Sequence, residues 1–111
     1  MIVPLQCEPL SLQTTSQILK GIRAAVERHN TLRLEGIVLT MYEENNELCR
    51  KIAEKVRGQM PPELVFPTPI PRTEATVEAF AAGQPVVLRS PNDAASAAYM
   101  ALADALTQRS A

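Results

Sequence analysis

Three carboxylates follow the ends of two expected strands and are the first side chains to consider for chemistry. Glu8 comes after an apolar segment at the start of the chain, and Glu43 and Glu44 come after a second one. Because parallel strands end at one edge of a sheet, these groups would converge there as a metal or acid–base cluster. No histidine or aspartate completes a ligand set, so we interpret them as exposed loop carboxylates and expect no metal site.

The two cysteines and the single histidine do not form a recognisable reactive site. Cys7 and Cys49 have neither CxxC nor metal-ligand spacing, and no neighbouring base suggests a nucleophile. We interpret both as reduced thiols in or near the core, since nothing in their spacing supports a disulfide. His29 falls at the end of an expected helix, where an imidazole most often interacts with the helix dipole. We therefore expect no catalytic residue among these side chains.

Composition excludes several classes of protein. The 111 residues include 11 Lys and Arg against 12 Asp and Glu, so no net basic field indicates nucleic acid as the partner. No apolar run approaches the roughly 20 residues that cross a bilayer, and no basic segment precedes an apolar one as in a secretory signal. We expect a single domain over residues 1–111 and a cytoplasmic location, with nucleoid association left open.

Apolar segments of strand length recur along the chain. The central one is Leu34–Met41, a continuous run rich in aliphatic residues and too short for a helix, as is typical of a buried parallel strand. Met1–Leu5, Glu63–Phe66 and Val86–Leu88 are expected to be further strands or extended edges. Pro4 cannot donate to a ladder, so the first strand must tolerate a missing bond or lie at an edge.

Helical patterns fill the intervals between these segments. Ser11–His29 has apolar residues at helical period, and Asn45 or Asn46 is expected to cap a second helix. Thr73 is expected to cap a short third helix, and Ser90–Asp93 to open the last one. This alternation predicts an α/β fold of three layers, with a mainly parallel sheet of three to four strands and flanking helices.

Four segments in this order resemble a known family: Ile2–Glu8, Leu34–Met41, Ile70–Arg72 and Gly83–Val86. Together they resemble the C-terminal half of the ParA/Soj family of chromosome- and plasmid-partitioning ATPases, relatives of the septum-site protein MinD. The resemblance implies part of a P-loop NTPase fold of the deviant Walker type. It also implies an ATP- and Mg-dependent dimer that binds nucleoid DNA without sequence preference and is stimulated by a ParB-like partner.

The catalytic apparatus of that family is not found in this sequence. There is no GxxxxGK[ST] segment, and the four glycines are too scattered to form a phosphate cradle. The strand aspartate of the magnesium site is missing as well. We therefore interpret the chain as a truncated family member, and expect neither tight cofactor binding nor ATP hydrolysis by this chain alone.

The resemblance assigns the adenine side of a nucleotide pocket to two loops, with Thr40 and Met41 on one and Pro71 and Arg72 on the other. Met41 and Pro71 offer apolar faces to a purine, and exposed amides in the loops would read its edge. Arg72 has an alternative role in hydrogen-bonding carbonyls of its proline-stiffened loop. Without phosphate contacts, the affinity of this site is expected to be weak.

The DNA contacts of the family do not transfer to this chain. Asn45 and Ala75 stand where the family usually has basic residues, and this removes much of the driving force for non-specific DNA binding. The next helix carries further basic residues, which we interpret as a solvated face: Arg50, Lys51, Lys55 and Arg57.

Two functional hypotheses remain open. In the first, the chain is the part of a partitioning ATPase that supplies the base-side loops and C-terminal helices of an ATP-gated dimer. In the second, it is a non-enzymatic interaction or regulatory module that docks with a full-length ParA-like partner, because half a sheet leaves an edge exposed.

Overall fold

A two-stranded parallel sheet lies at the centre of the protein. The computed structural model describes residues 1–7, 12–29, 31 and 33–110. Strand β1 (Ile2–Gln6) pairs with β2 (Gly36–Thr40), with Ile2 opposite Gly36 and Gln6 opposite Thr40. The predicted strands at the start of the chain and at Leu34–Met41 are therefore confirmed: β1 is shifted by one residue from Met1–Leu5, and β2 is shorter than its apolar run.

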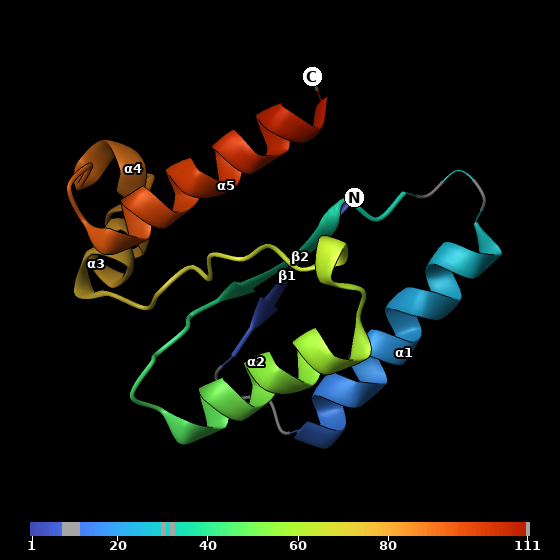
Figure 1. Ribbon diagram of the computed structural model, residues 1–111. Coiled ribbons are helices and arrows are strands. Elements are labelled where there is room, and N and C mark those ends of the chain that lie inside the picture. The colour runs from blue at the N-terminus through green and yellow to red at the C-terminus, as the bar shows by residue number, and fades with distance from the viewer. Residues whose placement is uncertain (8–11, 30, 32, 111) are drawn as a thin grey trace.

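Helices cover both faces of this sheet (Figure 1). α1 (Leu12–Arg28) and α2 (Glu47–Gln59) pack together on one face, and α5 (Ala94–Ser110) lies on the other. The predicted three-layer α/β architecture is confirmed, but the sheet has two strands among the described residues rather than the predicted three to four. Among the helices of the described residues, none combines the length and apolar character that a membrane span requires.

Alternate residues of β2 enter two separate cores. Ile37 and Leu39 belong to the cluster shared with α1 and α2, which also contains Ile52 and Val56. Val38 belongs to the second cluster, into which α5 contributes Ala98 and several partly buried side chains. Burial of both faces explains why β2 reads as a continuous apolar run rather than an alternating one.

The predicted strand Glu63–Phe66 is wrong for most of its length. Pro62–Leu64 forms a 3-10 turn, η1, which is closed by a hydrogen bond from the Val65 N–H to the Pro62 carbonyl at 3.3 Å. Only Val65 joins the sheet, through an isolated parallel bridge to Ile37. Proline at the first position of the turn has a fixed φ that suits a helical turn better than a ladder.

The segment after η1 continues beside β2 but pairs with it intermittently. The Phe66 N–H donates to the Ile37 carbonyl at 3.0 Å, and the Ile70 N–H then donates to the Leu39 carbonyl at 2.7 Å. Between these two hydrogen bonds the segment advances by four residues, from Phe66 to Ile70, whereas β2 advances by only two, from Ile37 to Leu39. The two intervening prolines have no N–H, which explains why this segment does not form a continuous third strand.

The predicted strand Val86–Leu88 is also wrong, because these residues begin a short helix, α4 (Val86–Arg89). Pro85 precedes the helix with a φ of −63°, and its carbonyl accepts the N–H of Arg89 at 3.1 Å. The buried Ser96 hydroxyl of α5 lies 2.6 Å from the Ser90 carbonyl and 3.1 Å from the Val86 carbonyl, so its one hydrogen bonds the backbone at the two ends of α4. A helical turn satisfies these backbone groups locally, whereas the described residues offer no strand beside them.

Most of the predicted helix caps are present. The N-cap of α2 is Asn46, whose side-chain oxygen accepts the Cys49 N–H at 3.1 Å. Thr73 caps α3 (Glu74–Ala82), and Gly83 ends that helix with a φ of 67°. The last helix starts later than predicted: the Asp93 carboxylate, rather than the Ser90 side chain, accepts the N–H of Ala95, the second residue of α5.

Strand β1 is paired on one side only within the part of the chain that the structure describes. The Cys7 N–H donates to the Thr40 carbonyl at 3.0 Å. Because successive backbone groups of a strand point to opposite sides, Leu5 also faces β2, whereas Pro4 faces away from it. Of the two alternatives for Pro4, a missing bond or an edge position, the described residues show the edge position: its absent N–H removes no bond between β1 and β2.

Candidate functional site

The two predicted base-side loops lie next to each other at the carboxyl edge of the sheet. Tyr42 and Pro71 form a parallel bridge, with the Tyr42 N–H donating to the Ile70 carbonyl at 3.0 Å. The Arg72 N–H returns a hydrogen bond to the Tyr42 carbonyl at 3.0 Å. The backbone thus joins the residue after Met41 directly to the Pro71–Arg72 segment.

Met41 has an unusual backbone conformation at the point where β2 ends. Its φ is 54°, the only positive value outside glycine in the part of the chain that the structure describes. A non-glycine residue in this region carries a cost on the order of 1 kcal/mol, which neighbouring interactions must offset. The left-handed turn redirects the chain after Thr40, so that Tyr42 faces the neighbouring segment.

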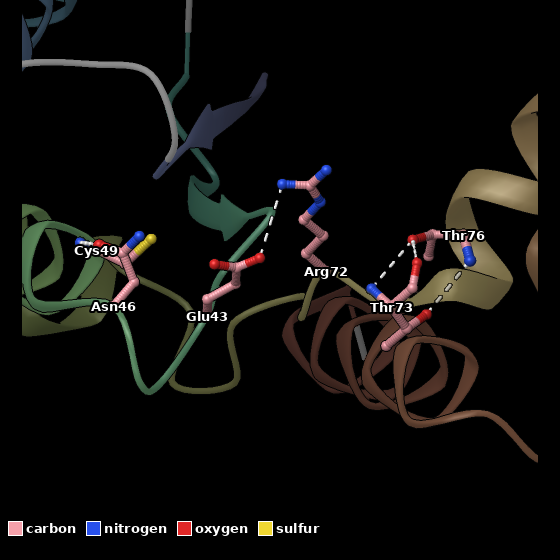
Figure 2. A network of polar contacts seen from close by, with 6 residues as sticks. All are labelled: Glu43, Asn46, Cys49, Arg72, Thr73 and Thr76. Atoms are coloured by element: carbon pink, nitrogen blue, oxygen red, sulfur yellow. Dashed lines mark hydrogen bonds and ion pairs between the residues drawn. The ribbon is translucent and has the colours of Figure 1, made fainter.

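Arg72 forms an ion pair across the two loops. Its Nη1 lies 3.7 Å from Glu43 Oε1, and the two side chains are 42% and 37% exposed. Figure 2 shows the guanidinium and the carboxylate pointing toward each other from the ends of their segments. An anion bound at Arg72 would therefore have to share this arginine with a carboxylate.

Two hollows flank the joined loops. One, of about 440 Å³, is lined by Arg72 and Val77 together with Thr73 and three carboxylates: Glu43, Glu74 and Glu78. The other, also about 440 Å³, is lined by residues of both loops and the start of α5: Tyr42, Glu44, Thr68, Pro69, Pro71, Ala94, Ala97 and Ala98. Of the four residues predicted to contact the base, Arg72 lines the first hollow and Pro71 lines the second. Thr40 and Met41 line neither hollow.

The second hollow contains residues that the sequence interpretation missed. Tyr42 lines this hollow with Pro69 and Pro71 and also packs against the core shared with α1 and α2; the two prolines offer apolar surface suited to the flat face of a purine. Tyr42 immediately follows the predicted Met41, and Pro69 lies within the predicted loop. Their closeness in sequence to Met41 and Pro71 could have marked both residues as candidates for the site. That they line the same hollow could be seen only in the folded structure.

The candidate carboxylate cluster is only partly described. Glu43 contacts Arg72, and the Glu44 carbonyl accepts a hydrogen bond from Arg50 at 2.7 Å. Glu8 lies outside the described residues. Within residues 1–7, 12–29, 31 and 33–110, no three His, Cys, Asp or Glu side chains gather as potential metal ligands.

The two thiols are fully buried beneath this edge of the sheet. Cys7 and Cys49 are both free and have no exposed surface. Burial raises the pKa of the Cys7 thiol from 9.0 to about 11; Cys49 adds to the rise, and Arg57 opposes it. A thiol that holds its proton so strongly is a poor nucleophile at neutral pH.

Lys51 and Arg57 of α2 have local partners. Lys51 lies 3.3 Å from Glu47 one turn earlier, and both side chains are largely exposed. Arg57 donates to the Pro67 carbonyl at 3.4 Å. Asn45 is exposed in the loop before α2, at one of the positions where a basic residue was expected from the family pattern. These contacts agree with the interpretation of α2 as a solvated helix face.

Comparison with known proteins identifies relatives along nearly the whole chain. No protein-family model matches the sequence. The chromosome partitioning protein ParA of Caulobacter vibrioides is 36% identical over 110 residues, which are 98% of this chain and 41% of that protein. The sporulation initiation inhibitor protein Soj of Bacillus subtilis is 33% identical over 104 residues, 93% of this chain and 41% of that protein.

A third relative, the chromosome partitioning protein ParA of Myxococcus xanthus, is 31% identical over 98% of this chain and 38% of its own length. The chain thus spans about two fifths of the length of the curated relatives it matches. Such coverage is consistent with a C-terminal fragment of these proteins. The predicted resemblance is therefore confirmed, and the chain is a relative of the ParA/Soj chromosome-partitioning proteins over almost all of its own length.

Proposed function

We propose that this chain supplies the adenine-side loops and the C-terminal helices of a ParA/Soj-type ATPase that acts in chromosome or plasmid segregation. The observation that carries the proposal is the backbone pairing of Tyr42 with Pro71, which joins the two loops assigned to the base. In the complete assembly, the remaining part of the ATPase supplies the P-loop and the magnesium ligand. ATP then gates a dimer that responds to a ParB-like partner.

The base-side contacts divide between apolar and polar groups. Met41, Tyr42 and Pro71 provide apolar surface for the purine, and the loop amides after Thr40 read its edge. Arg72 lines the hollow on the opposite side of the Tyr42–Pro71 bridge and would contact the ligand from there. A nucleoside without phosphate contacts is expected to bind with a Kd on the order of 1 mM. The same reasoning predicts no ATP hydrolysis by this chain alone, since its sequence has no phosphate cradle.

A joined protein tests the proposal. The part of the C. vibrioides relative that this chain does not match would be fused to residues 1–111, and ATP binding would be measured with a fluorescent analogue. Binding that weakens severalfold in Pro71→Gly and Arg72→Ala, but not in the control Arg89→Ala, supports the assignment. A folded fusion that ignores ATP contradicts it.

Non-specific DNA binding is expected to be weaker than in relatives with basic residues at these positions. Asn45 and Ala75 supply no cation, and the α2 cations contact neighbouring groups. The joined protein carrying Asn45→Arg and Ala75→Lys is expected to bind duplex DNA more tightly than the unchanged fusion, with a steeper dependence on salt.

The one-sided pairing of β1 favours a second candidate function, a module that docks with a full-length ParA-like partner without catalysis. The exposed edge of β1 presents backbone groups of Ile2 and Gln6 for pairing, while Pro4 restricts which strands fit. Size-exclusion chromatography with light scattering, with and without a full-length relative, tests this function. Co-elution as a stoichiometric complex supports it, and a dilute monomer that ignores the relative contradicts it.

A further inference from the structure

One carboxylate connects the base-side loop to the last helix. Asp93 Oδ2 accepts a hydrogen bond from the Thr73 hydroxyl at 2.8 Å and another from the Ala95 N–H at 2.9 Å. Thr73 lies 20 residues earlier and directly follows Arg72. The single oxygen therefore links the end of the Pro71–Arg72 loop to the N-terminus of α5.

The Thr73 hydroxyl is fully used in this arrangement. While it donates to Asp93, it accepts the Thr76 N–H at 3.3 Å, and the Thr73 N–H donates to Thr76 Oγ1 at 3.2 Å. Figure 2 shows this reciprocal pair beside Arg72 at the start of α3. Thr73, the residue that follows the Pro71–Arg72 loop, is thus held by two helices: it caps α3, and it bonds to Asp93 at the start of α5.

The other end of the loop is fixed by the sheet. Ile70 donates to the Leu39 carbonyl at 2.7 Å, and its side chain is packed in the cluster that α5 joins through Ala98. Pro71 and Arg72 therefore lie between an anchor on β2 and an anchor on α5. Only the second anchor depends on a side-chain hydrogen bond that a single substitution removes.

We propose that Asp93 is a positioning residue of the nucleotide site: through Thr73 it holds Arg72 and Pro71 in the orientation that contacts the base. This role rests on the proposed function of the loop. A carboxylate that only capped α5 would affect the stability of that helix and leave the loop unchanged. If Asp93 instead positions the loop, its removal lowers the affinity of the site for the base.

Two pairs of variants separate these roles. Asp93→Ala and Thr73→Val remove the hydrogen bond, whereas Asp93→Asn and Thr73→Ser keep an oxygen or a hydroxyl that can rebuild it. The 111-residue chain would be titrated with adenosine by NMR. We expect Asp93→Ala and Thr73→Val to weaken binding about tenfold, the loss of roughly one hydrogen bond, and the two conservative variants to stay within about twofold. Asp104→Ala, on the exposed side of α5, is the matched control and is expected to bind as the unchanged chain does.

Amide hydrogen exchange provides a readout that needs no nucleotide. Arg72 donates its N–H to Tyr42, and Cys7 donates its N–H to Thr40 in the paired region between the strands. We expect Asp93→Ala and Thr73→Val to speed exchange at Arg72 severalfold while exchange at Cys7 stays the same. Equal protection of Arg72 in all variants would overturn the proposal, as would equal adenosine affinity. If adenosine fails to bind the unchanged chain, the proposed function fails and the exchange at Arg72 still decides the role of Asp93.

Discussion

Arg72 and Glu43 leave neighbouring segments at the carboxyl edge of the sheet and form an ion pair, with Arg72 Nη1 3.7 Å from Glu43 Oε1. Both side chains are more than a third exposed, so solvent screens the pair and it contributes at most about 1 kcal/mol to folding. Its larger consequence is electrostatic. A carboxylate beside the arginine opposes the approach of negatively charged phosphates.

Glu43→Gln is therefore expected to change the free energy of unfolding by less than about 1 kcal/mol while favouring charged nucleotides. In the joined protein, we predict that ATP binds about two- to fivefold tighter in this variant and that adenosine affinity stays nearly constant. Parallel titrations with ATP and adenosine measure the difference. An equal change for both ligands would show that the carboxylate acts on loop structure instead.

Gly36 is predicted to be intolerant of a side chain. A Cβ at this position would lie 2.6 Å from Cε2 of the buried Phe66 ring, whereas a Cβ at Gly21 in α1 would meet nothing within 4 Å. Gly36→Ala should lower the free energy of unfolding by about 1–3 kcal/mol through overpacking. The control Gly21→Ala should raise it by roughly 0.5–1 kcal/mol, because alanine suits a helix interior better. Urea denaturation checks both values, and equal stability of the two variants would contradict the packing.

The buried Cys7 thiol predicts a loss of stability at high pH. Its pKa is raised from 9.0 to about 11, first by burial and then by Cys49. Below pH 9 the folded and unfolded chains both hold the proton, so the thiol has no effect. Between pH 9 and 11 only the unfolded chain ionises, so the free energy of unfolding should fall by roughly 1–3 kcal/mol.

Denaturation curves at pH 8 to 10.5 measure this loss. Lysines and tyrosines also titrate in this range, so the comparison is with Cys7→Ala, which should show a shallower decline across the same pH values. Equal declines would show that burial of the thiol does not penalise its ionised form.

Pro4 is predicted to limit self-association through β1. It faces away from β2, so Pro4→Val adds an N–H and an apolar branched side chain to the exposed edge without changing the bonds to β2. The variant should show a larger apparent mass in light scattering at high protein concentration. Pro4→Lys adds the same N–H with a charge and should associate less than Pro4→Val. Identical masses for all three chains would contradict this role of the edge.

The main elements could be predicted because their patterns are local. The buried run of β2 and the caps Asn46 and Thr73 each depend on residues within one element. The errors at Glu63–Phe66 and Val86–Leu88 have one physical cause. In both places a proline directly before the apolar segment favours a helical turn over strand pairing.

The candidate site was less accessible from the sequence. The family resemblance assigned Met41 and Pro71 to two base-side loops, and the structure joins these loops through the bridge of Tyr42 with Pro71, while the contact with a base stays a prediction. The pairing of Arg72 with Glu43 and of Thr73 with Asp93 could not be read from spacing. Each joins residues 20 or more positions apart, and both depend on where the proline-rich loop places Arg72 and Thr73.

The most direct test of the account is an adenosine titration of the 111-residue chain by NMR, with cytidine as the control ligand. We predict saturable shifts with a Kd on the order of 1 mM at the amides of Met41, Tyr42, Arg72 and Thr73, and weaker shifts with cytidine. A separate apolar hollow of about 500 Å³ lies between α3, α4 and α5, lined by residues that include Phe80 and Met100. Shifts confined to that hollow, or no shifts at saturating adenosine, would contradict the assignment of the base-side loops.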